Sequence, residues 1–171
     1  MVLFKKKFIT RFFSLIPLLI LFFLAFSETD FNFEKLSFLS FNLIYILIFY
    51  WVLKNPAILG YGFIFLAGIV NDVVMGLPIG VSSVTYLILA GFAAYIRYLT
   101  VQPSLIYDWI VFLPSIAVTN SVYFYILRIF FDIEINYIIL ALNTGVTILF
   151  YPIIGILFNF IASLIIVKKN V

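Results

Sequence analysis

Apolar segments of membrane-spanning length recur along the whole sequence, and they limit the folds that the chain can adopt. The chain has 171 residues, 66% hydrophobic and 10% charged, whereas soluble domains contain about 45–50% apolar and about 25% charged residues. A helix needs roughly 20 apolar residues to cross a hydrocarbon core of about 30 Å. We therefore predict an all-α, polytopic integral membrane protein with a single transmembrane domain over residues 1–171.

The apolar pattern predicts about six transmembrane helices joined by short connections. Pro56 disfavours helix in the residue before it, so a tight turn is expected at residues 54–56. Glycine and proline in residues 76–80 break the next apolar run. The last segment would be about 45 Å long as a straight helix, so Pro152 and Gly155 within it predict a kink or a tilt. The predicted spans are residues 8–26, 36–52, 57–75, 81–97, 109–127 and 138–167.

The basic residues predict the orientation in the membrane, because cytoplasmic ends of spans are enriched in Lys and Arg. With the amino terminus inside, eight of the ten basic residues fall on the cytoplasmic side and five of the seven acids fall on the outer side. Both termini are therefore expected in the cytoplasm, which implies an even number of spans. Trp51 would lie in an aromatic belt at the inner interface. The eight residues are Lys5, Lys6, Lys7, Arg11, Lys54, Arg97, Lys168 and Lys169.

The first segment permits a second interpretation, a cleavable signal peptide. Lysines at residues 5–7, an apolar run and the small residues at 25 and 27 fit that pattern loosely. The run approaches spanning length and the cleavage pattern is poor, so retention as a transmembrane helix is favoured. The other spans keep their orientation in both cases.

The residue types that the chain lacks exclude several kinds of catalytic and metal-binding site. It has no Cys and no His, which removes disulfides, thiol nucleophiles, histidine ligands and serine–histidine catalysis. It has no phosphate-binding loop, nucleophile elbow or metal-ligand cluster, and only Asp72 is clearly an intramembrane carboxylate. We expect a non-enzymatic protein without a metal or a cofactor. The net charge of +3 does not indicate nucleic-acid binding, because the basic residues cluster at segment ends.

Asp72 is the strongest candidate for a functional site, because it is ionisable and lies within an apolar segment. A charge at membrane depth costs about 2.5–3.5 kcal/mol, so such residues usually face protein or water. Asp72 lies four residues after Gly68 and four before Gly76, so all three should share one helix face. Glycines there would let another backbone approach closely. The carboxyl group either makes a buried polar contact or meets interfacial water.

Several polar residues at a similar depth are possible partners for Asp72. Arg128 is the natural counter-charge if the carboxyl is ionised, and Asn143 or Ser82 would share a hydrogen bond if it is protonated. Two further partners at this depth are Ser83 and Thr144.

A longer pattern around Asp72 resembles the MreD family of rod shape-determining proteins over residues 50–95. Residues 50–53 read YWVL and residues 60–63 read GYGF. The other residues that carry the resemblance, with Trp51 and Gly62 from these two runs, are Pro56, Gly68, Asp72, Gly76 and Gly80.

The resemblance to MreD implies a role in the bacterial elongation machinery. It implies a non-catalytic inner-membrane protein that binds MreC directly and is linked through MreC to the actin-like MreB. It also implies association with the peptidoglycan synthase RodA and its cognate transpeptidase. The implied fold is that of the six-helix substrate-binding subunit of energy-coupling-factor vitamin transporters.

That fold offers an alternative function, a substrate-binding membrane subunit of a vitamin transporter. Such subunits typically dock through small-xxx-small positions on the first helix, and Phe12–Phe26 contains no such pair. They also need polar or aromatic groups that converge at the outer face to hold a ligand. Asp72, Asn143 and Arg128 would supply these groups. Asn120, near mid-membrane, is expected to make a structural interhelical hydrogen bond rather than a transport contact.

Overall fold

The described part of the chain is entirely α-helical, which confirms the predicted class. The computed structural model describes residues 15–27, 41–100, 104–132 and 136–170, with side chains as far as Ser163. These residues form seven helices and no strand. They are α2 (Ile16–Phe26), α3 (Leu43–Lys54), α4 (Pro56–Leu59), α5 (Tyr61–Met75), α6 (Val81–Leu99), α7 (Leu105–Phe131) and α8 (Tyr137–Asn170).

Three helices are long and apolar enough to cross a membrane, which agrees with a membrane protein. They are α6, α7 and the part of α8 that ends at Ser163. The apolar helices α2, α3 and α5 are shorter, with 11, 12 and 15 residues, or roughly 16–23 Å at 1.5 Å per residue. Parts of the predicted spans 8–26 and 36–52 lie outside the described residues.

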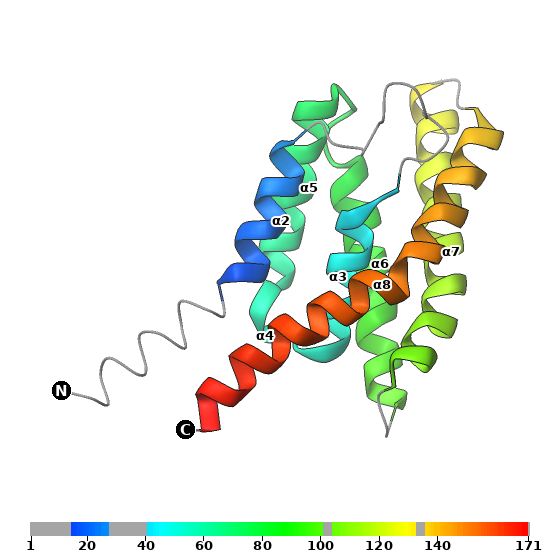
Figure 1. The fold of residues 1–171 in the computed structure, drawn as a ribbon. Helices are drawn as coiled ribbons and strands as arrows, with labels where there is room; N and C mark the ends of the chain where they lie inside the picture. Colours follow the sequence, from blue (N-terminus) through cyan, green and yellow to red (C-terminus); the bar gives the residue numbers. More distant parts are fainter. Residues whose placement is uncertain (1–14, 28–40, 101–103, 133–135, 171) are drawn as a thin grey trace.

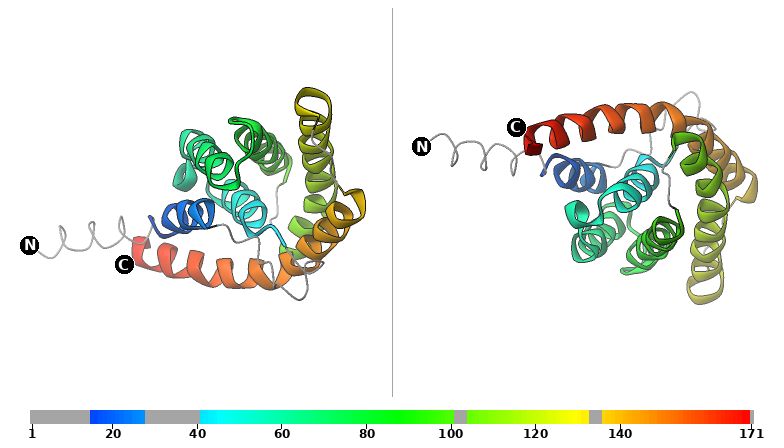
Figure 2. Two further views of the ribbon diagram at one scale, coloured as in Figure 1. Left: turned by 90° about the horizontal axis from the view of Figure 1, so that it is seen from above. Right: turned by 90° about the horizontal axis from the view of Figure 1, so that it is seen from below.

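The helices other than α4 run alternately up and down one bundle (Figure 1). Seen along the bundle, α3 lies in the middle, with α2, α5, α6 and α8 around it (Figure 2). All ten residues from Ile44 to Leu53 are buried. A helix that is apolar on every side is stable only when other elements enclose it. The core of the bundle is therefore built around α3.

Two helix boundaries refine the predicted spans. The helix α3 begins at Leu43, and residues 36–40 of the span predicted at 36–52 lie outside the described residues. The Asn42 side chain accepts a hydrogen bond from the Tyr45 backbone N–H over 3.1 Å and so caps the helix. The span predicted at 57–75 is interrupted at Gly60, whose φ of +62° separates α4 from α5.

Two predicted connections are confirmed. One residue, Asn55, separates α3 from α4, which begins at Pro56. Residues 76–80 separate α5 from α6. The second connection reverses the chain within five residues and packs α5 against α6 (Figure 1).

The last two helices are joined by polar contacts along their length. The Trp109 indole Nε1–H donates to the Ile148 carbonyl oxygen over 2.8 Å. The Asn120 amide donates to the Thr144 hydroxyl oxygen over 2.6 Å, which confirms the interhelical bond expected for Asn120. The helix α8 continues through Pro152 and crosses the bundle obliquely (Figure 1), in keeping with the predicted tilt.

Trp51 does not lie in an interfacial belt, and that prediction is wrong. The side chain is 2% exposed and packs edge-on against Tyr50 and at a tilt against Phe158. The reason is that α3 has no outer surface on which an aromatic residue can reach the membrane interface.

Candidate functional site

Gly68 brings α5 and α6 into backbone contact. A Cβ atom at Gly68 would lie 2.4 Å from the Ser83 Cα and 2.5 Å from the Ser83 backbone nitrogen. Across the same contact, the Ser83 hydroxyl donates to the Phe65 carbonyl oxygen over 2.9 Å. Since real Cβ contacts are never this short, only glycine at residue 68 allows this approach.

Asp72 lies next to this contact and caps the following helix. Its side chain is fully buried. Its Oδ2 accepts the Gly80 backbone N–H over 2.7 Å and its Oδ1 accepts the Ser82 backbone N–H over 2.9 Å. The first N–H groups of a helix lack partners within the helix and carry partial positive charge. The Asp72 carboxylate on α5 therefore accepts hydrogen bonds from N–H groups at the amino end of α6. It is not exposed to interfacial water.

Gly76 does not share a helix face with Asp72 as predicted, and Gly80 and Gly62 have other positions again. Gly76 lies beyond the end of α5, in the left-handed region at φ +63°, so it terminates the helix and nothing packs against it. Gly80 has a φ of +104° and precedes α6, where its N–H reaches Asp72. Gly62 is exposed, and a Cβ added there would meet nothing within 4 Å.

Replacing Asp72 by Asn should destabilise the protein. A carboxamide has one acceptor oxygen, whereas the backbone N–H groups of Gly80 and Ser82 each bond to a separate oxygen of Asp72. The second N–H would face the new NH₂ group, and a buried donor without an acceptor costs about 1–3 kcal/mol. Asp72→Leu removes both acceptors and should cost more. The measurement is the thermal midpoint of the purified protein and its abundance in membranes.

The matched control for this substitution is Asp132→Asn, whose side chain is 95% exposed. It should leave both quantities unchanged. A thermal midpoint of Asp72→Asn equal to that of the wild type would contradict the capping role.

The structure does not bring Arg128 and Asn143 to Asp72. Arg128 Nη1 lies 4.0 Å from Asp132 Oδ1, one turn away on the surface at the end of α7, where an exposed pair contributes little. Asn143 faces a pocket that Asp72 does not line. The two backbone donors take both carboxylate oxygens of Asp72, so it needs no side-chain partner.

A buried ion pair at the other end of the bundle was not predicted from the sequence. Lys54 Nζ at the end of α3 lies 2.6 Å from Asp108 Oδ2 in the first turn of α7. The Asp108 side chain is 1% exposed and that of Lys54 is 22% exposed. Tyr50 and Tyr151 lie within electrostatic reach of Asp108. The pair joins the central helix to α7, whereas Lys54 was interpreted only as a topological anchor.

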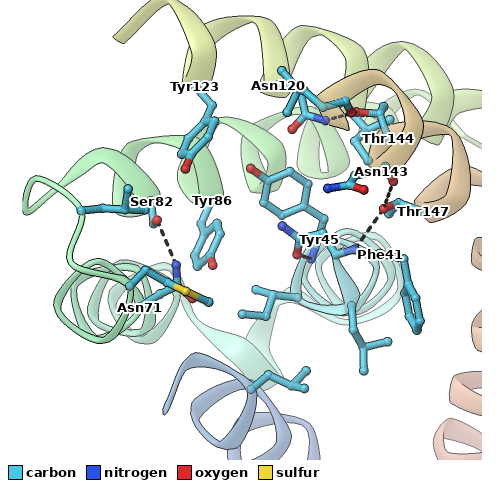
Figure 3. Close-up of a pocket in the computed structure, with 18 of the residues that line it drawn as sticks. Phe41, Tyr45, Asn71, Ser82, Tyr86, Asn120, Tyr123, Asn143, Thr144 and Thr147 are labelled. Atoms are coloured by element: carbon cyan, nitrogen blue, oxygen red, sulfur yellow. Dashed lines mark hydrogen bonds between the residues drawn. The ribbon is translucent and has the colours of Figure 1, made fainter. Parts of the chain in front are cut away.

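A pocket of about 500 Å³ lies at the end of the bundle where α3 and α8 begin, opposite this ion pair. Figure 3 shows part of its wall. Helices α2, α3, α5, α6, α7 and α8 all contribute to its wall. We call it the amide pocket, after its five asparagines. Its polar residues are Ser27, Asn42, Tyr45, Asn71, Ser82, Tyr86, Asn120, Tyr123, Asn136, Asn143, Thr144 and Thr147.

Hydrogen bonds fix several side chains in the wall of the amide pocket (Figure 3). The Asn71 amide donates to the Ser82 hydroxyl over 3.1 Å, which connects the pocket to the α5–α6 contact. The Thr147 hydroxyl oxygen accepts a hydrogen bond from the Asn42 backbone N–H over 3.0 Å. The same hydroxyl donates to the backbone carbonyl oxygen of Asn143. The sequence interpretation proposed Asn143 alone of these as a ligand-binding group. The signal available was the position of Asn42, Asn71, Asn136 and Asn143 near the same ends of their segments.

No charged residue lines the amide pocket among the described residues. Within that same part of the chain, no group of three or more His, Cys, Asp or Glu residues is placed to hold a metal ion. The site therefore offers hydrogen bonds and apolar contacts to a ligand.

No protein-family model matches this chain, and no curated protein or solved structure matches it either.

Proposed function

We propose that this protein is a non-catalytic inner-membrane component of the bacterial elongation complex, acting with MreC and MreB in lateral peptidoglycan synthesis and in the control of cell shape. One observation carries the proposal. The residues that resemble the MreD pattern include Gly68, Asp72 and Gly80. Gly68 allows the close backbone contact between α5 and α6, and the Asp72 carboxylate accepts the Gly80 N–H at the start of α6. A pattern that specifies a packed helix pair suits a protein that works by binding partners.

The proposal includes a topology of six spans with both termini in the cytoplasm. The alternating direction of the helices supports it (Figure 1). Lys54 and Arg97, at the ends of α3 and α6, fall at the same end of the bundle, as the positive-inside rule expects. Direct binding to MreC, and association with RodA and its transpeptidase through the complex, complete the proposal.

Depletion of the protein should convert rod-shaped cells into rounded, swelling cells in which septation continues. The physical reason is that the lateral synthesis complex would lose one of its membrane subunits. The measurement is the ratio of cell length to width after depletion, with re-expression of the wild-type chain as the control. The tagged full chain, purified in detergent, should also carry MreC with it.

A second candidate function, substrate capture for a vitamin transporter, is favoured by the amide pocket. A pocket of about 500 Å³ is within the usual range of about 300–1,000 Å³ for small-molecule sites. The two functions predict different outcomes of the depletion experiment. Depleted cells that stay rod-shaped but require an added vitamin would overturn the first proposal in favour of the second. Purification with transporter ATPases in place of MreC would point the same way.

A further inference from the structure

One exposed side of α8 is apolar except for a carboxamide. The helix runs along the outside of the bundle (Figure 2), and its part up to Ser163 is apolar enough to cross a membrane. Ile156, Leu157 and Phe160 are each more than half exposed, and Asn159 lies among them and is exposed as well. In a membrane this side of α8 meets acyl chains. Asn159 therefore places a polar group on a surface that otherwise offers lipid apolar side chains.

Asn159 belongs to the apolar length of α8 and not to its charged end. No charged residue occurs between Glu134 and Lys168. Asn159 precedes Lys168 by nine residues, which is about 14 Å along a helix. Polar side chains within spanning helices are costly in lipid and usually contact protein or water. The exposed position of Asn159 therefore calls for a partner.

The Asn159 carboxamide is only partly used within its own chain. Its Oδ1 accepts a hydrogen bond from the Tyr50 hydroxyl over 3.4 Å, which leaves the oxygen a second lone pair. Its NH₂ group has no partner among the described residues. Tyr50 is fully buried in the central helix, so this bond holds the side chain of Asn159 against the bundle. Two donors and one acceptor position remain for another molecule.

We propose that this side of α8 binds the same side of α8 in a second copy of the chain, with reciprocal hydrogen bonds between the two Asn159 carboxamides. A carboxamide is complementary to itself in partial charge, because its N–H groups are positive and its oxygen is negative. Asparagine side chains form such bonds between spanning helices. The proposal rests on the position of α8 in a membrane and on neither function proposed above.

The symmetry of a dimer favours a second copy over a different partner. Two copies in one membrane share their orientation, so a two-fold axis along the membrane normal brings both Asn159 residues to the same depth. A different helix would need a polar group of its own at that depth. Ser163 lies one turn further along the same face and is exposed. Its hydroxyl donates to the Phe160 carbonyl oxygen over 2.7 Å, so its small side chain lets a second helix approach without losing a hydrogen bond.

The first test is cysteine crosslinking of the full chain alone in phosphatidylcholine vesicles. The chain has no cysteine of its own, so one introduced thiol reports one contact. Ser163→Cys, next to the proposed axis, should give a disulfide-linked dimer on oxidation. Val118→Cys, which is exposed on α7, is the matched control and should stay monomeric at the same ratio of protein to lipid.

The second test measures how strongly the copies associate, by energy transfer between labelled chains as lipid is added. Asn159→Leu keeps the side-chain size and removes the carboxamide, so association should weaken about tenfold. Asn159→Gln keeps a carboxamide and should restore most of it. Ser121→Leu removes an exposed hydroxyl from α7 and should associate as the wild type does. Equal thermal midpoints in dilute detergent show that each variant is folded.

Each outcome decides the proposal. Association that Asn159→Leu weakens and Ser121→Leu does not supports it. A chain that is monomeric at every lipid ratio overturns it, and Asn159 then meets water or lipid headgroups. Association that Asn159→Leu leaves unchanged overturns it as well, because the copies then meet through another face. A monomeric chain whose Asn159→Leu variant recovers less MreC from cells would assign this face to a partner's helix and overturn the second copy. Cell shape after depletion tests the proposed function separately.

Discussion

Gly68→Ala should strongly destabilise the protein although it adds a single methyl group. The new Cβ would lie 2.4 Å from the Ser83 Cα, and a backbone atom cannot move aside as a side-chain end can. Forcing extra volume into a packed contact costs about 1–3 kcal/mol, and a clash with backbone belongs at the upper end. For a chain of this size that corresponds to a fall of roughly 6–12 °C in the thermal midpoint. The measurement is thermal unfolding in detergent.

Gly62→Ala is the matched control on the same helix, since a Cβ there meets nothing within 4 Å. It should leave the midpoint unchanged or raise it slightly, because alanine favours helix over glycine by about 1 kcal/mol. Equal midpoints for the two variants would show that α5 and α6 are not in close contact at Gly68. Gly68→Leu should additionally reduce recovery of MreC, if partner binding depends on the α5–α6 unit.

Lys54→Met should produce the second large effect. The substitution keeps the length of the side chain and leaves Asp108, which is 1% exposed, as a buried charge without its partner. Breaking a buried ion pair in this way costs about 3–5 kcal/mol. The measurement is again the thermal midpoint, together with abundance in membranes. Arg97→Met, an exposed basic residue at the same end of the bundle, is the control and should have little effect.

The double variant Lys54→Met, Asp108→Leu separates loss of charge balance from loss of packing. An apolar pair of similar volume often replaces a buried ion pair at no cost, so this variant should recover most of the lost stability. A double variant that is as unstable as Lys54→Met alone would mean that the unpaired charge is not the cause.

The class of fold and several turns could be predicted because they depend on local sequence. Residues 76–80 break α5 whatever surrounds them, and Pro56 restricts the residue before it through its own ring. The start of α3 at Leu43 is also marked in the sequence, because Asn42 is a good N-cap residue. Apolar length alone does not reveal this boundary.

The partners of the candidate residues could not be predicted in the same way. Asp72 was compared with side chains at a similar depth, whereas its actual donors are the backbone N–H groups of Gly80 and Ser82, and backbone donors do not appear in a residue pattern. Lys54 and Asp108 each resemble an interfacial residue in sequence. Only the packing of α3 against α7 brings them together out of water.

The central position of α3 has a consequence for how the protein is made. With 12 residues, α3 is about 18 Å long, shorter than a hydrocarbon core of about 30 Å, and it presents no side to lipid. Acyl chains therefore cannot hold it in place, and its place depends on the helices synthesised after it. Until α5 and α6 have left the ribosome, the insertion machinery must shelter this segment. Truncated nascent chains that end before residue 81 should accordingly remain attached to the translocon.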